Sequence, residues 1–203
     1  MIRLRQITFA CLLASCSSLL AYELDWRDVG WVESDDVVQV ETYNNIDGSN
    51  IDVTVELMIA GGDWFQDTEV NSSGELILFA DHLRDERDTN YIDVALRFSA
   101  PVQAVSFRIN DVDLGDNGSG ANFWEDVIEN IRADYQGTPV NTGYVTNVGS
   151  GITIDTTSEP GDTLYRGNEN LAWNKPSQMT VNWDDPITAF SYRYSSGENA
   201  IWN

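Results

Sequence analysis

The chain has 203 residues, of which 33 are acidic and 11 basic, giving a formal net charge of −22 at pH 7. Such an excess of carboxylates repels phosphate groups, so the composition predicts no nucleic acid and no anionic membrane surface among the partners. The length suits one domain with a sizeable core.

The first 21 residues have the pattern of an export signal. Arg3 and Arg5 precede an apolar run at residues 7–13, and small residues follow. The run is too short to span a bilayer as an anchor. Cleavage after Ala21 would leave one domain of residues 22–203, which contains no cysteine and therefore no disulfide.

A lipoprotein signal at residues 1–15 is the alternative, because Leu13-Ala14-Ser15-Cys16 is similar to a bacterial lipobox. A lipid on Cys16 would be the protein's only attachment to a membrane. Both interpretations indicate an exported bacterial protein. We expect an extracellular or outer cell-surface location, with a membrane-tethered lipoprotein as the alternative.

Short strands and polar turns fill the rest of the chain. Residues 122–135 fit either a helix or a strand, and we favour a strand after Asp126. Residues 143–155 predict a hairpin, and residues 158–176 a long loop. Residues 75–79 and 178–183 predict short strands. Apolar and polar residues alternate, as in half-buried strands, at residues 37–43, 51–59, 92–98, 105–110 and 187–194. Many short strands with little helix predict an all-β fold, an antiparallel two-sheet β-sandwich of the jelly-roll type.

A weak internal repeat relates residues 98–108 to residues 183–193. Pro101 matches Pro186, and the alanine, serine and arginine that follow are also identical. Proline fixes φ and donates no ladder hydrogen bond, so each copy is predicted to be a hairpin with proline in a tight turn. Duplication and two independent hairpins explain the similarity equally well.

An acidic loop follows the strand that contains Val105, Phe107 and Ile109. If the strand continued, Asp111 and Asp113 would lie on the same face as Val105, Phe107 and Ile109. Burying an unpaired carboxylate on a core face is costly, so the strand should leave the core at Asp111. Calcium takes six to eight oxygen ligands. We predict that Asp111, Asp113, Asp116 and Asp126 form a Ca²⁺ site. The alternative is that the acidic loop is a solvated turn.

A second oxygen-rich loop spans residues 44–52. Asp47, Asn50 and Asp52 have suitable oxygens for an ion, but the residue types favour a turn.

Seven tryptophans are many for this length. Tryptophan fills sandwich cores, and exposed tryptophan stacks on sugar rings. Trp183 lies on an alternating strand and is predicted to be in the core. Trp64 and Trp173 lie in predicted loops, and we expect them to form a platform for polysaccharide.

Catalytic motifs are missing from the sequence. The chain has a single histidine, His82, in a charged loop, and no nucleophile elbow, zinc-protease motif or phosphate-binding loop. We therefore predict a protein that is not an enzyme. The many acidic residues leave a glycosidase-type carboxylate pair open as an alternative.

Two segments resemble a loosely defined group of exported bacterial β-sandwich modules found in cell-surface and matrix proteins. The first is Val105-Ser-Phe107-Arg-Ile109-Asn-Asp111-Val-Asp113, and the second is Trp124-Glu-Asp126-Val127. The resemblance implies fold and location, since most such modules have no known function.

Together these features predict an exported, non-enzymatic binding or cell-surface module, stabilised by calcium and binding carbohydrate. The alternatives are a structural matrix component that associates with itself and a small polysaccharide hydrolase or lyase.

Overall fold

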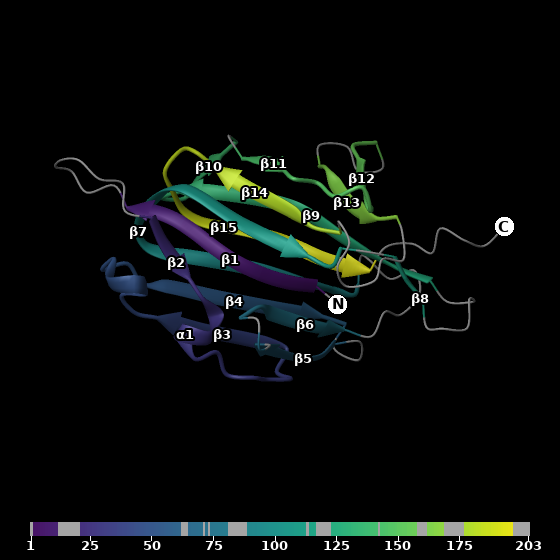
Figure 1. Cartoon of the computed structure of the whole chain (residues 1–203), viewed down its shortest axis with the longest axis horizontal. Coiled ribbons are helices and arrows are strands. Elements are labelled where there is room, and N and C mark those ends of the chain that lie inside the picture. The colour runs from purple at the N-terminus through teal and green to yellow at the C-terminus, as the bar shows by residue number, and fades with distance from the viewer. Residues whose placement is uncertain are drawn as a thin grey trace.

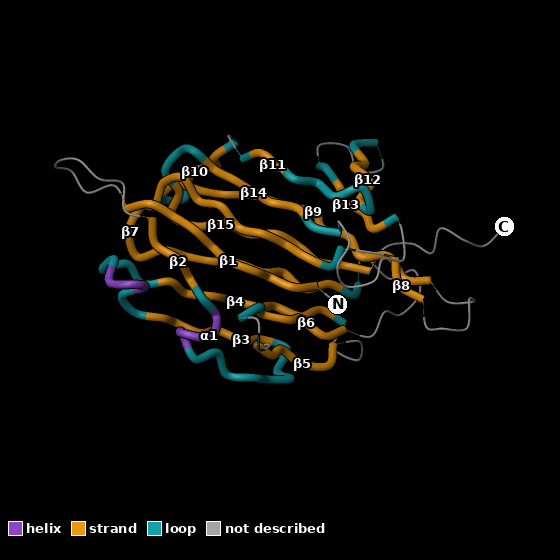
Figure 2. The backbone as a smooth tube through the Cα atoms, in the orientation of Figure 1, coloured by secondary structure: helices purple, strands orange, loops and turns teal. Residues whose placement is uncertain are grey.

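The computed structural model describes residues 2–11, 21–61, 65–70, 72, 74–80, 89–112, 114–116, 123–141, 143–157, 162–168 and 177–196. Nearly all of these residues lie in strands or in the loops between them (Figures 1 and 2). The helices among them are α1 (Trp26–Val29) and the 3-10 turn η1 (Ile46–Gly48). Neither has the length to cross a membrane.

The first strands are β1 (Ile2–Cys11), β2 (Ala21–Leu24), β3 (Val38–Tyr43), β4 (Val53–Ala60), β5 (Phe65–Val70), β6 (Leu76–Ala80), β7 (Tyr91–Asn110) and β8 (Leu114–Asp116). The others are β9 (Phe123–Tyr135), β10 (Thr138–Val140), β11 (Tyr144–Thr146), β12 (Ile152–Asp155), β13 (Leu164–Gly167), β14 (Met179–Trp183) and β15 (Ile187–Ser196). Residues 122–135 were ambiguous in sequence. Phe123–Tyr135 form a strand throughout, which confirms the strand interpretation.

The long strand β7 belongs to both layers of a sandwich. Its first half pairs with β4 and β15, and its second half pairs with β1 and β14. One layer therefore has the order β3-β4-β7-β15-β9-β13-β12, and the other has the order β11-β14-β7-β1-β6-β5. These ladders are antiparallel, so the predicted all-β antiparallel sandwich is confirmed.

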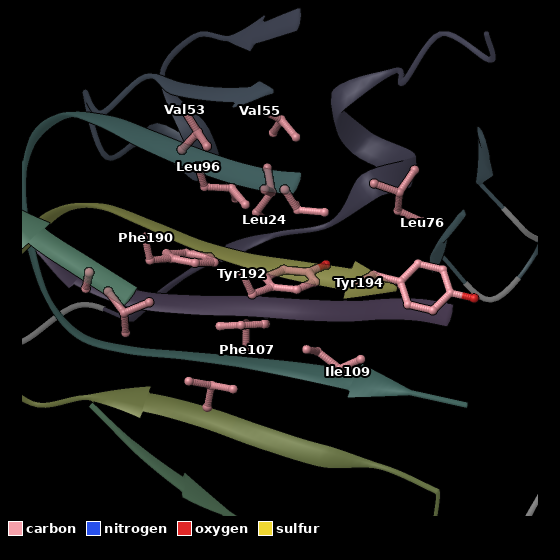
Figure 3. Packing of buried hydrophobic residues seen from close by; sticks show 14 of the residues in the cluster. Leu24, Val53, Val55, Leu76, Leu96, Phe107, Ile109, Phe190, Tyr192 and Tyr194 are labelled. Carbon is pink, nitrogen blue, oxygen red and sulfur yellow. The ribbon is translucent and has the colours of Figure 1, made fainter. Parts of the chain in front are cut away.

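Aromatic rings fill the space between the layers. Phe107 on β7 stacks on Phe190 and Tyr192 of β15, with ring centroids 4.7 and 5.6 Å apart. Figure 3 shows these rings between strands of the two layers, with Val53 and Leu96 in the same cluster. On β4 and on the second half of β7 the apolar residues of the alternation are buried, whereas on β3 Val38 and Val40 are exposed and Gln39 is buried.

The predicted hairpins at Pro101 and Pro186 are wrong. Strand β7 continues through Pro101 from one layer into the other, with Ala104 at a φ of 53°. Pro186 lies between β14 of one layer and β15 of the other. Both prolines therefore mark places where the chain changes layer, and the two segments run antiparallel beside each other, with Ile187 opposite Val102. A residue without an N–H donor fits such an interrupted ladder as well as it fits a turn.

The segment predicted as an export signal contributes a strand. In this structure of the full chain, Ile2–Cys11 form β1 and pair with β7, β6 and β2. Export and the site of cleavage remain predictions.

Candidate binding pocket between the layers

The strand that leads to the acidic loop ends where the sequence predicted. Strand β7 stops at Asn110, and Asp111 has a φ of 65°. The next residue, Val112, donates its backbone N–H to the carbonyl of Ser177 at 2.9 Å. Asp111 is half-buried at the point where the chain leaves the ladder.

The other predicted calcium ligands are not seen to converge. Asp113 lies outside the described residues, and Asp116 is described only as the backbone end of β8, opposite Phe123. Asp126 is buried on β9 and accepts a hydrogen bond of 2.8 Å from the Tyr194 hydroxyl. Among the described residues no three acidic, histidine or cysteine side chains form a metal-binding group. The calcium site therefore stays a prediction.

Buried acids on β9 have partners on neighbouring strands. Glu125 accepts a hydrogen bond of 2.8 Å from Arg166, whose Nε lies 3.3 Å from Asp155. Glu129 accepts a hydrogen bond of 3.1 Å from Ser195. Arg166 belongs to β13, within the segment predicted as a long loop, so this pairing could not be predicted. These contacts hold β9, β13 and β15 together.

The second oxygen-rich loop is a turn. Asp52 accepts a hydrogen bond of 2.9 Å from the backbone N–H of Asn45, and the side chain of Asn45 accepts one of 2.8 Å from Asn50. Two of its polar side chains therefore satisfy the backbone of the loop itself. Asp47 lines a separate polar hollow of about 640 Å³.

Trp183 is the one of the three tryptophans given a role from the sequence that lies among the described residues, where Trp26 and Trp31 are also buried. Trp64 and Trp173, the predicted platform, lie outside the described residues. Trp183 is 1% exposed, and its ring stacks on Phe107 and Phe190 with centroids 5.9 and 5.2 Å apart. Its prediction as a core residue is confirmed.

A pocket of about 790 Å³ opens beside Trp183, where the two layers approach each other. Strands β9, β10 and β13 of one layer and β11 and β14 of the other contribute to its lining (Figure 1). Two tyrosines join Trp183 there, Tyr144 from β11 and Tyr165 from β13. The pocket thus combines three aromatic residues that are far apart in the sequence.

Local contacts fix the aromatic residues of the pocket. A Cβ atom added to Gly143 would lie 2.4 Å from Nε1 of Trp183, so the backbone passes closer to the indole than any side chain would permit. Tyr144 is 44% exposed, and its hydroxyl donates a hydrogen bond of 3.0 Å to Asp184. That hydrogen bond raises the pKa of Tyr144. Burial, and to a smaller extent the charge of Asp162, raise the pKa of Tyr165.

Asn130 connects the charged groups of the pocket. Its backbone N–H donates to Asp162 at 3.0 Å, and its side-chain oxygen accepts a hydrogen bond of 2.7 Å from Arg132. Asp162 also accepts from the backbone N–H of Thr163 at 2.8 Å. Asp162 is the one carboxylate among the described lining residues. Tyr144 is the exposed aromatic ring of the described lining, beside these hydrogen-bonding groups, whereas Tyr165 and Trp183 are buried.

Sequence reasoning missed this pocket because it depends on pairing between distant segments. The predicted hairpin at residues 143–155 is wrong, since β11 pairs with β14 and β12 with β13. Strand β13 lies in the predicted loop, so Tyr165 could not be placed near Tyr144. An exposed tyrosine after the glycine at position 143 was the only local signal.

No family model and no curated protein matches the chain. Among solved structures, the chain is similar to the adhesin domain of PrgB from Enterococcus faecalis bound to DNA, with 14% sequence identity and a TM-score of 0.23. The match covers 79% of this chain and 62% of that one, so this chain spans less than two thirds of the length of that structure.

The prediction that nucleic acid is not a partner is corrected by this comparison. The adhesin domain is bound to DNA, so the exclusion based on net charge does not stand. A likeness at this level gives no ligand for the present chain.

Proposed function

We propose that this protein is an exported, non-enzymatic binding module of the bacterial cell surface, and that it binds polysaccharide in the pocket beside Trp183. The observation that carries the proposal is the set of Tyr144, Tyr165 and Trp183 around one pocket of about 790 Å³, together with Arg132 and Asp162. An extracellular location follows from the predicted export signal, with tethering through Cys16 as the alternative.

The chemistry of the pocket suits a sugar. The apolar face of a pyranose ring stacks on aromatic side chains, and its hydroxyls need donors and acceptors at the edges. Arg132 supplies donors, and Asp162 and Asn141 supply acceptors, from the same lining. The exposed ring of Tyr144 is the most accessible stacking surface.

Binding to a glycan array, followed by calorimetry with the best ligand, tests the proposal. Tyr144→Ala should weaken binding about tenfold, since stacking of one ring is worth about 1 kcal/mol or more. Tyr135→Ala is the matched control, because Tyr135 is also an exposed tyrosine but does not line the pocket. Equal losses in both variants, or binding of DNA without binding of any glycan, would contradict the proposal.

An assay for new reducing ends on each bound polysaccharide distinguishes binding from hydrolysis. A single carboxylate in the described lining supports binding without turnover. Turnover that disappears in Asp162→Asn would replace this proposal by a polysaccharide hydrolase.

A self-associating matrix component is the second candidate. Four apolar side chains are half or more exposed on or beside β3 and β4, namely Val37, Val38, Val40 and Met58. Clustered exposed apolar residues favour protein contacts. Sedimentation equilibrium tests this candidate: assembly that rises with concentration and is reduced by Val40→Lys would support it, and a monomer at all concentrations would contradict it.

A further inference from the structure

Strand β1 is an interior strand of its layer, with other strands on both sides of it. It pairs with β7 from Arg3 opposite Asn110 to Cys11 opposite Val102. On its other side it pairs first with β6, from Ile2 opposite Leu78 to Leu4 opposite Leu76, and then with β2, from Ile7 opposite Leu24 to Ala10 opposite Ala21. In the described part of the chain, β6 and β7 have no pairing with each other. The spacing of strands in a sheet makes the place of β1 about 10 Å wide between β6 and β7.

The sequence of β1 fits this place in detail. Its large apolar residues stand at even-numbered positions first, 2 and 4, and then at the odd-numbered positions 7, 9 and 11. The ladder with β7 has a register shift between Leu4 and Ile7, which compensates for this change from even to odd positions. Leu4 is therefore opposite Ile109 and Ile7 opposite Phe107, and both of these β7 residues are buried in the core. The register therefore sets these β1 positions against buried residues of β7.

Contacts that do not involve β1 hold the hairpin of β5 and β6. Thr68 on β5 accepts a hydrogen bond of 3.0 Å from Trp31 and donates one of 3.0 Å to Gln39. Next to β6, Glu75 accepts a hydrogen bond of 3.2 Å from Asn110 at the end of β7. The hairpin thus keeps contacts with Trp31, with β3 and with the end of β7 that do not involve β1, and we infer that its wall of the place persists without β1.

The segment that fills this place is also the segment predicted to be removed on export. Cleavage after Ala21, or before Cys16, would remove all of β1. Two rows of backbone donors and acceptors, and core residues such as Phe107 and Ile109, would then lie beside an empty place. Open strand edges of this kind accept extended peptides by strand addition.

We propose that the place of β1, between β7 on one side and β6 and β2 on the other, is a strand-acceptor groove in the exported protein. It binds an extended segment of another protein that is apolar at alternate positions and carries basic residues between them. The proposal rests on the predicted export signal and is independent of the polysaccharide pocket.

Charge indicates a partner other than a second copy. The resident strand carries Arg3 and Arg5, and Arg3 is opposite Asn110, which is hydrogen-bonded to Glu75. Outside residues 1–21 the chain has only nine lysines and arginines against 33 acidic residues. Association with a second acidic copy is opposed by this charge, whereas a basic segment is attracted by it.

The test uses the protein as bacteria export it. Intact mass should show a chain that begins at Tyr22 or at a lipidated Cys16. A synthetic peptide of residues 2–11, with Cys11→Ser to prevent oxidation, should bind this protein with a micromolar Kd and raise its melting temperature. Binding should weaken as salt is added, because the arginines contribute.

Two altered peptides test the mode of binding. Ile7→Pro removes a backbone donor and should abolish binding, since proline breaks a paired strand. Arg3→Glu with Arg5→Glu should weaken binding at least tenfold and leave the apolar pattern intact. A β-type circular dichroism spectrum and a cooperative melting transition serve as the control for correct folding of the exported protein.

Three results would overturn the proposal. The first is an exported chain that keeps residues 2–11. The second is a cleaved, folded chain that does not bind the peptide. The third is a cleaved chain whose groove is filled by a second copy, seen as a dimer that the peptide does not dissociate.

Discussion

Arg193 on β15 and Asp93 on β7 lie directly opposite each other and form a two-pronged ion pair. The Nε atom donates to one carboxylate oxygen at 2.7 Å, and a terminal guanidinium nitrogen donates to the other at 2.9 Å. The same guanidinium lies 3.5 Å from the ring centroid of Tyr91. The hydrogen bond with Asp93 raises the pKa of Arg193. In the internal repeat Arg193 corresponds to Arg108, which lies opposite Thr180, so the pairing is specific to the second copy.

Arg193→Lys should lower stability by about 0.5–1 kcal/mol, because lysine cannot make the two-pronged contact or stack flat on Tyr91. The figure is small since both side chains are partly solvated. The melting temperature should fall by about 1–4 °C. Arg97→Lys is the control, as Arg97 forms a single, exposed contact of 3.5 Å with Glu56. An equal shift in both variants would contradict this account.

Tyr192→Phe should leave stability at pH 7 unchanged or raise it by up to about 1–2 kcal/mol. The Tyr192 hydroxyl is buried and has no hydrogen-bond partner in the described structure, so phenylalanine removes a group whose burial is costly. Chemical denaturation at pH 7 measures the difference. Tyr135→Phe, at an exposed position, should have little effect.

The same variant should reduce the loss of stability in alkali. Burial raises the pKa of Tyr192 well above its ordinary value of 10. Above about pH 10 the unfolded chain releases the tyrosine proton while the folded chain keeps it, so stability falls as pH rises. The stability of Tyr192→Phe should fall less between pH 9 and 11 than that of the parent protein. Parallel curves would show that this tyrosine does not titrate as described.

Local pattern predicted which residues of β4 face the core but not those of β3, where Val38 and Val40 are exposed and Gln39 is buried. Val53, Val55 and Leu57 alternate with polar residues in the sequence, and all three are buried on β4. The end of β7 before Asp111 was also predicted, because a carboxylate at a position that would face the core indicates that the strand stops there.

Layer assignment and strand pairing could not be predicted in the same way. Pro101 is compatible with a tight turn and with a strand that changes layer, and only the pairing of β7 with four other strands distinguishes them. The pocket depends on this pairing as well, since Arg132, Tyr144 and Trp183 come from β9, β11 and β14. Asp126 shows the same limit, because its burial against Tyr194 depends on the pairing of β9 with β15.

Gly143→Ala should disturb the pocket. The new methyl group would lie 2.4 Å from Nε1 of Trp183, and the indole cannot withdraw because it is stacked on Phe107 and Phe190. Overpacking of this kind costs about 1–3 kcal/mol, and polysaccharide affinity should fall with stability. Denaturation and calorimetry measure the two effects.

Gly137→Ala separates backbone strain from this clash. Gly137 has a φ of 83° and open space around its Cβ position, so alanine there should lower stability without changing affinity. If Gly143→Ala kept full affinity, the close approach of Gly143 to Trp183 would not shape the ligand site.

Calcium should raise the melting temperature, and Asp111→Ala combined with Asp113→Ala should remove that rise. The reason is the position of Asp111, half-buried at a φ of 65° where β7 leaves the core and an acidic, glycine-rich segment begins. At a concentration about 100 times Kd, a bound ion adds about 2.7 kcal/mol, which corresponds to a rise of about 5–10 °C. Asp35→Ala with Asp36→Ala is the control, since these exposed acids remove equal charge elsewhere. Melting curves that do not change between Ca²⁺ and chelator, or that change equally in both double variants, would show that the acidic segment is a solvated turn.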